Sequence, residues 1–240
     1  MRTKSKEFTV SIHDCDLSEY SLSFGYDNST QTYKVVAFYV EDKGSRNPKT
    51  MVKVFSLGDN SWRDLQCFPL IPLYWFSDKC YHNGVHLNGT INWLAHHDYK
   101  SVDDHYVILS LDLSTETYTQ LLLPLGFDNK DDWPKIVLLA DRLCFCHDFE
   151  ETHFVMWQMK DFGVQDSWIQ LFKISYENHL ESAYLLPLYL SENTLLLANE
   201  RDLKTSIYSC IDNKVEKTAI RNNIGWLYAM DYVESLVPTH

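Results

Sequence analysis

Residues 84–94, Gly-Val-His-Leu-Asn-Gly-Thr-Ile-Asn-Trp-Leu, contain two short apolar runs on either side of Asn88-Gly89. Asn and Gly favour tight turns because both tolerate backbone conformations that other residues avoid. Short runs rich in β-branched and aromatic residues on either side of such a turn are typical of β-strands. The stretch therefore predicts two strands joined by a tight turn.

The same arrangement recurs along the chain with a fixed period. The strands that follow these turns begin at Ile91, Leu143 and Leu195, so that both spacings are 52 residues. In three of the repeats an aromatic residue begins a further strand; these residues are Trp62, Tyr118 and Trp168. Turns equivalent to Asn88-Gly89 occur at the corresponding positions of the other repeats, at Asp27-Asn28, Asp141-Arg142 and Glu192-Asn193. Repeats of about 50 residues with four strands each indicate the blades of a β-propeller.

The whole chain fits an all-β fold, a kelch-like β-propeller of four-stranded blades. Further strand-like runs include Tyr33–Val40, Met51–Leu57, Tyr106–Leu111, Phe154–Met159 and Thr205–Ile211. The four visible units are 20–69, 81–124, 133–174 and 184–220, with one more strand expected in 226–237. We expect residues 20–240 to form this domain and residues 1–19 to be an extension with a short closing strand at Phe8–Ile12. A β-sandwich is the alternative fold, and the sequence leaves open both the number of blades and whether the ring closes.

Composition excludes several classes of protein. Of the 240 residues 45% are hydrophobic, which is enough to build a large core, and the formal net charge is −12. A strong excess of acid argues against binding to nucleic acid, which requires Lys and Arg to displace counterions. No apolar run approaches the roughly 20 residues that a bilayer requires, and no signal peptide is recognisable. The six cysteines are therefore expected to be reduced thiols in a cytoplasmic or nuclear protein.

Candidate chemical sites are weak. Cys144 and Cys146 should point to one face of a strand and His147 to the other, and no second pair of ligands is present for zinc. The acidic residues Asp27, Asp141 and Glu192 could act as acid and base in a propeller hydrolase, yet all three coincide with predicted turns. We therefore expect no cofactor, no metal and no enzymatic activity.

The longer connections predict a binding surface. In an up-and-down meander the connections after the second and fourth strands lie at the same end of a sheet. These connections carry a combined formal charge of −8 and several large aromatic side chains, a combination typical of protein-binding surfaces. They are Glu41–Thr50, Leu70–Tyr81, His96–His105, Leu125–Pro134, Asp148–Thr152, Ser175–Tyr184 and Asn199–Thr205. The candidate partner-binding residues are Tyr74, Trp75, Phe76, Tyr99, Asp103, Asp104, Asp131, Asp132, Trp133, Phe149 and Glu150, and the expected partner is a basic protein.

A series of short motifs, in order, resembles the plant F-box-associated interaction domain. It runs from Phe24-Gly25-Tyr26-Asp27 through Gly84–Gly89 with Trp93-Leu94, Leu109–Leu113 with Glu116, and Ser167-Trp168 to Tyr232–Leu236. The resemblance covers roughly residues 22–237.

The resemblance implies a specific role. Proteins of this family resemble substrate receptors of Skp–cullin–F-box ubiquitin ligases, in which an F-box binds the Skp adaptor and the β-rich part captures the protein to be ubiquitinated. No F-box precedes residue 20, and the usual Asn-Gly-Leu and Trp-Asn-Pro segment is missing, so the chain is expected to be truncated and to bind Skp only if an F-box lies upstream. Two alternatives remain: a decoy that binds targets without an F-box, and a propeller that binds or hydrolyses carbohydrate.

Overall fold

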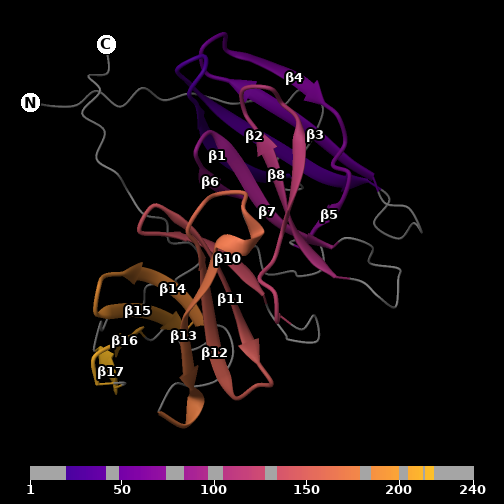
Figure 1. The fold of residues 1–240 in the computed structure, drawn as a ribbon. Helices are drawn as coiled ribbons and strands as arrows, with labels where there is room; N and C mark the ends of the chain where they lie inside the picture. Colours follow the sequence, from indigo (N-terminus) through magenta and orange to yellow (C-terminus); the bar gives the residue numbers. More distant parts are fainter. Residues whose placement is uncertain are drawn as a thin grey trace, which may run out of the picture.

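The computed structural model describes residues 20–41, 49–73, 84–96, 105–127, 134–178, 185–199, 205–212 and 214–218. In these residues the chain forms four antiparallel sheets that follow one another along the sequence (Figure 1). Sheet A contains β1 (Ser21–Asp27), β2 (Thr32–Glu41), β3 (Lys49–Ser56) and β4 (Ser61–Leu65). Sheet B contains β5 (Ile71–Pro72), β6 (Val85–Leu87), β7 (Thr90–His96), β8 (Tyr106–Asp112) and β9 (Tyr118–Leu122).

The second half of the chain repeats the pattern. Sheet C contains β10 (Lys135–Leu139), β11 (Arg142–Phe149), β12 (His153–Met159) and β13 (Trp168–Ser175). Sheet D contains β14 (Leu185–Leu190), β15 (Thr194–Asn199), β16 (Thr205–Ser209) and β17 (Lys214–Thr218). Short 3₁₀ turns occupy Gln165–Ser167 and Tyr176–Asn178, and the described part holds no helix of the length and apolarity that a bilayer crossing demands.

Sheets A, C and D are up-and-down meanders, as the repeated pattern of the sequence predicts. The strand orders β1-β2-β3-β4, β10-β11-β12-β13 and β14-β15-β16-β17 follow the chain without a crossover. The predicted turns lie between the first and second strands of the sheets, and the predicted aromatic residues open or nearly open the fourth strands. The all-β prediction with four-stranded units is therefore confirmed.

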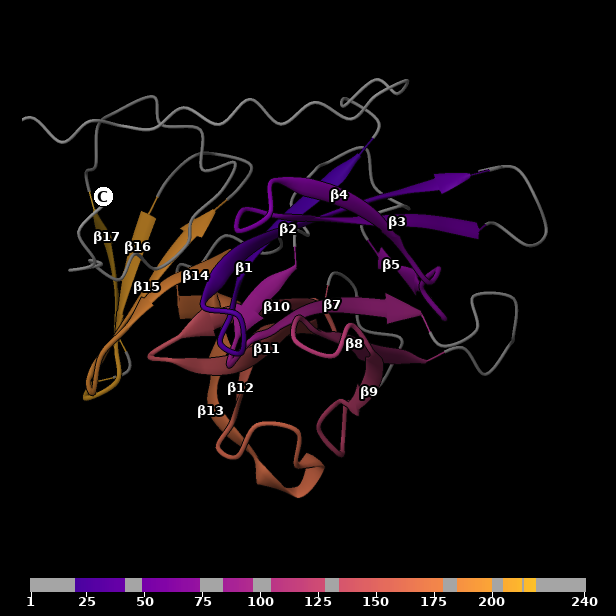
Figure 2. The ribbon, with the colours of Figure 1, turned by 90° about the horizontal axis from the view of Figure 1, so that it is seen from above.

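The first strand of each sheet lies on the inside of the array. Strand β1 contacts β6, and β10 contacts both β6 and β14. Figure 2 shows β1, β10 and β14 near the middle, whereas the fourth strands β9, β13 and β17 lie at the outside. This radial order is that of propeller blades, not of two flat layers.

Sheet B departs from the simple repeat because its inner position is filled by two short strands. Strand β5 pairs with the end of β7 at Ala95 and His96, and β6 pairs with the beginning of β7 at Thr90–Asn92. Sequence patterning predicts only the second piece, since β5 has two residues and one of them is Pro72.

Apolar layers between neighbouring sheets hold the array together. One cluster joins sheets A and B around Phe38 and Trp93, and another joins B and C around Ile108 and Phe145. A third joins C and D around Met156 and Leu197. Trp168, one of the aromatic residues that open a fourth strand, is buried in the second cluster, where its Nε1 donates to the carbonyl oxygen of Leu122 at 3.0 Å. These layers bury both faces of sheets B and C and so remove far more apolar surface from water than one sheet could alone.

Candidate binding surface

The meander gives each sheet two different ends. The turns between the first and second and between the third and fourth strands form the short-turn end, and the remaining connections form the long-connection end. Of the candidate binding residues, Phe149 and Glu150 lie in the described part, in the β11–β12 hairpin at the long-connection end. The others lie outside the described residues: Tyr74, Trp75, Phe76, Tyr99, Asp103, Asp104, Asp131, Asp132 and Trp133.

The β11–β12 hairpin presents two adjacent carboxylates to solvent. Glu150 and Glu151 are exposed and form a turn closed by the Thr152 amide, which donates to the Phe149 carbonyl oxygen at 2.9 Å. Their φ angles are 48° and 54°, in the left-handed region that Asn and Gly occupy most easily. The chain therefore holds two like charges side by side in a backbone conformation that glutamate does not favour.

Phe149 is held firmly beside this turn. The Lys173 ammonium of β13 lies 4.0 Å from the centre of the Phe149 ring, a cation–π geometry. The His153 ring stands at 70° to the Phe149 ring, with 6.4 Å between their centres. A half-buried aromatic ring and two solvated carboxylates thus share one hairpin, as expected for an anchor with a charged rim.

Buried polar side chains support the same end of sheets C and D. Asp148 is buried and accepts a hydrogen bond from the Tyr176 hydroxyl. Lys135, at the start of β10, is also buried, and its Nζ donates to the carbonyl oxygen of Leu185 at 3.5 Å, which links the inner strands of the two sheets. The burial of Lys135 was not predicted from the sequence. The feature that could have indicated it is a lysine as the first residue of an otherwise apolar strand.

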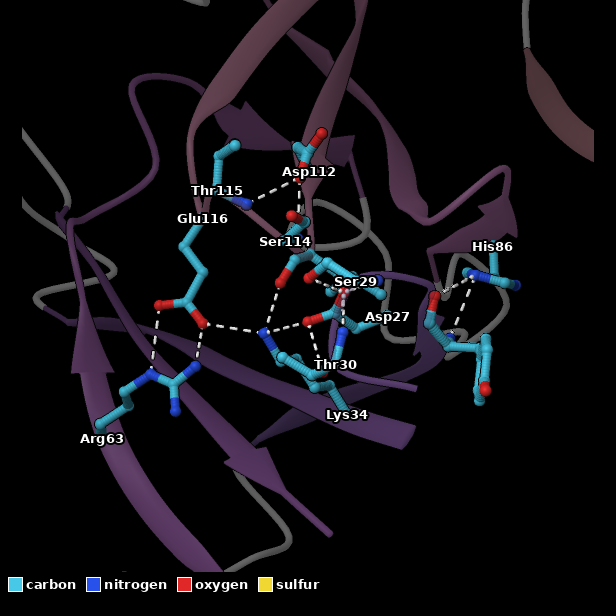
Figure 3. A network of polar contacts seen from close by, with 12 residues as sticks. Asp27, Ser29, Thr30, Lys34, Arg63, His86, Asp112, Ser114, Thr115 and Glu116 are labelled. Carbon is cyan, nitrogen blue, oxygen red and sulfur yellow. Dashed lines mark hydrogen bonds and ion pairs between the residues drawn. The ribbon is translucent and has the colours of Figure 1, made fainter. Parts of the chain in front are cut away.

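The short-turn end of sheets A and B contains a more extensive network that sequence reasoning also missed (Figure 3). Asp27 ends β1, and its Oδ1 accepts the Ser29 amide at 2.8 Å, which confirms its predicted role in the local turn. Its Oδ2 also lies 2.9 Å from Nζ of Lys34, and both side chains are almost fully buried. Burial opposes ionisation, but the hydrogen bonds from Lys34, Ser29 and Thr30 outweigh it and hold the pKa of Asp27 below its usual range.

The network continues across the boundary between the two sheets. Lys34 Nζ also donates to the Leu113 carbonyl oxygen and lies 3.2 Å from Oε1 of Glu116 in the β8–β9 turn. Arg63 of β4 binds Glu116 through two nitrogens, and the distance from its Nε to Oε2 is 3.1 Å. Burial raises the pKa of Glu116, but Arg63 and Lys34 more than offset this effect, so the pKa is lowered. These four charges stabilise the contact between sheets A and B and leave Asp27 unable to serve as a general acid.

The other acid–base candidates are separate from this network. Asp141 is exposed in the β10–β11 turn, and Glu192 is exposed in the β14–β15 turn. Within the described ranges no three His, Cys, Asp or Glu side chains are grouped so that they could hold a metal ion.

Cys144 and Cys146 lie on one face of β11 and His147 on the other, as the alternation along a strand predicts. Cys144 and Cys146 lie in the apolar layer between sheets C and D, whereas the His147 ring stacks beside Phe145 with 5.5 Å between the ring centres, on the other face of β11. Burial raises the pKa of the Cys144 thiol to about 12, which leaves it protonated at neutral pH.

Comparison with protein families agrees with this architecture. A model of the family described as the F-box associated beta propeller domain matches residues 3–239. The F-box/kelch-repeat protein At3g23880 of Arabidopsis thaliana is 26% identical over 98% of this chain and 60% of its own length, and the F-box protein CPR1 of the same plant is 26% identical over 88% and 54%. The chain thus spans a little over half the length of these curated relatives. An endo-arabinase from Bacteroides thetaiotaomicron is similar in structure with a TM-score of 0.41 and 14% identity, covering 88% of this chain and 77% of the arabinase.

Proposed function

The chain belongs to the F-box associated beta propeller family, and from this membership we propose that it is a substrate-recognition module of an F-box type ubiquitin ligase receptor. In this role it captures a protein and performs no chemistry of its own. Transfer of ubiquitin would require an F-box to bind the Skp adaptor, in a longer form of the protein or in a partner.

We further propose that the long-connection end captures a basic protein. The observation that carries this proposal is the strand order: in a meander the connections after the second and fourth strands lie at one end of the sheet. In the sequence the seven connections predicted for this end carry a combined formal charge of −8. Complementary charge steers a basic partner toward such a surface and suppresses the binding of acidic proteins. Phe149, fixed beneath Lys173 and next to exposed carboxylates, provides one anchor in the described part.

The proposal is tested by affinity capture from plant extract with the full chain as bait, followed by mass spectrometry and direct binding of the recovered protein. The variant Glu150→Gln/Glu151→Gln removes two exposed charges from the long-connection end. The control Asp141→Asn/Glu192→Gln removes two exposed charges from the short-turn end. We expect the first pair to weaken binding several-fold in low salt and the control pair to leave it unchanged. Equal effects of the two pairs, or an acidic partner, would contradict the proposed orientation.

The aromatic candidates Trp75 and Trp133 give a second test of the same surface. Replacing both with alanine should abolish capture, because buried aromatic anchors dominate protein interfaces. The melting temperature should change little if these side chains serve binding. A large loss of stability with unchanged capture would assign them to the core instead.

A further inference from the structure

The outer face of sheet A, the face turned away from sheet B, is apolar and partly exposed. Leu22, Phe24 and Tyr33 are 43%, 49% and 42% exposed. The rings of Phe24 and Tyr33 stack with their centres 5.0 Å apart, and Tyr26 meets the edge of the same Tyr33 ring. A cluster of aromatic rings on one sheet face is unusual for a surface that only water contacts.

The packing of the opposite face forces these side chains outward. Along β1 the alternate residues Ser23 and Gly25 face sheet B, where Ser23 Oγ accepts hydrogen bonds from the Gly84 amide at 2.9 Å and Trp93 Nε1 at 3.2 Å. A Cβ atom at Gly25 would lie 2.6 Å from Leu113 Cδ1, so a larger residue at this position would have to displace the Leu113 side chain. If β1 shifted by one residue relative to β2, Phe24 would point toward sheet B, where Gly25 now lies close to Leu113. The pairing register of β1 therefore determines which aromatic side chains are exposed.

A buried polar atom on the same face also lacks a partner. The residues Phe24, Val35, Phe55 and Trp62 stand opposite one another across the four strands of sheet A. Trp62 Nε1 is buried, yet within the described part of the chain it has no hydrogen-bond acceptor. Buried indole N–H groups are nearly always hydrogen-bonded, so this face calls for an additional acceptor as well as apolar cover.

We propose that the carboxy-terminal segment 226–237 of the same chain covers this face. The segment reads Trp-Leu-Tyr-Ala-Met-Asp-Tyr-Val-Glu-Ser-Leu-Val, and alternation along a strand places Trp226, Tyr228, Met230 and Tyr232 on one side. Those four side chains supply the apolar cover, and the backbone carbonyl groups of the segment supply an acceptor for Trp62.

The length of the chain allows this contact. Seven residues, 219–225, connect Thr218 at the end of β17 to Trp226. Fully extended, the eight steps from Thr218 to Trp226 can span about 27 Å, which exceeds the radius of gyration of about 18 Å of a compact domain of 240 residues. In the proposed arrangement the segment crosses from sheet D to sheet A and joins the last sheet to the first.

A double-mutant cycle in the full chain tests the contact. The face variant is Phe24→Ala/Tyr33→Ala, and the segment variant is Trp226→Ala/Tyr228→Ala. The control is Tyr189→Ala/Ile211→Ala, which removes exposed apolar side chains from the sheet D region. We expect the face and segment variants each to lower the melting temperature by about 4–8 °C, and their combination to lower it by clearly less than the sum. The control and segment variants should combine additively.

Hydrogen exchange and light scattering complete the test. In the segment variant the amides of β1 should exchange faster than in the native chain, while those of β12 stay unchanged. The native chain should remain monomeric at all concentrations. Additive face and segment effects, coupling of the segment to sheet D, or a dimer that the Phe24→Ala/Tyr33→Ala variant dissociates would each overturn the proposal.

Discussion

Replacing Lys34 with methionine should destabilise the protein strongly, because Lys34 is the shared cation of the network between sheets A and B. Its Nζ lies 2.9 Å from Asp27 Oδ2 and 3.2 Å from Glu116 Oε1, and its side chain is 5% exposed. Methionine preserves most of the volume of the side chain. The change therefore tests the charge itself, since it leaves the Asp27 carboxylate buried without its counterion.

Removing one partner of a buried ion pair typically costs about 3–5 kcal/mol. Glu116 retains Arg63, so the unpaired Asp27 accounts for most of this cost. For a domain of this size each kcal/mol lowers the melting temperature by about 2–4 °C, which predicts a fall of roughly 6–20 °C. The matched control is Lys53→Met in the same sheet, where the pair with Asp64 is largely exposed and should contribute less than about 1 kcal/mol.

The dependence on pH separates charge from packing. Because the pKa of Asp27 is lowered in the folded protein, its contribution to stability is complete above the unfolded pKa of about 3.9 and is lost as the pH falls below that value. In the Lys34→Met variant Asp27 takes up a proton more easily, so the variant loses less stability on acidification.

Urea unfolding at pH 7 and pH 3 measures this difference. We expect the gap in the free energy of unfolding between native and variant chains to be large at pH 7 and smaller at pH 3. Adding Asp27→Asn to the variant should recover part of the loss at pH 7. A gap that is equal at both pH values, or no larger than that of Lys53→Met, would refute the assignment of the loss to an unpaired charge.

Three further predictions concern single positions. Gly25→Ala should lower the free energy of unfolding by about 1–3 kcal/mol in chemical denaturation, since the new methyl group would meet Leu113 Cδ1 at 2.6 Å. At pH 8 iodoacetamide should modify the exposed Cys67 in the native chain but reach Cys144 only after unfolding, as peptide mass spectrometry would show, because burial raises the pKa of the Cys144 thiol to about 12. Glu151→Gly should raise the melting temperature by roughly 1–3 °C in calorimetry, because glycine adopts the positive φ of this turn without strain.

Much of the fold could be predicted from the sequence because its signals are local. Alternation marks β2 and β8, and the turn residues Asn88 and Asp141 stand between paired strands at the expected places. The position of Cys144 on one face and His147 on the other follows from the same period of two. The constant spacing of the units then gives the succession of sheets.

The polar network could not be predicted in this way because its members are far apart in the sequence. Lys34 and Glu116 are 82 residues apart, and their contact depends on how two sheets meet. In β2, Lys34 stands between the apolar residues Tyr33 and Val35, and this alternation predicts that Lys34 faces solvent. In the structure Lys34 is buried and Tyr33 is exposed. A small residue in the neighbouring strand, Gly25, is the visible sign that the sheets approach closely on that side.

The inner position of sheet B is formed by two separate strands, β5 and β6, so the length of the connection between them does not affect the position of either strand. The chain leaves at Pro72, returns at Val85, and both attachments pair with β7. Since β7 alone sets the register of both pieces, residues can be added to or removed from the excursion without shifting any strand. A peptide tag grafted into this connection should therefore leave the strand pairing of sheet B unchanged.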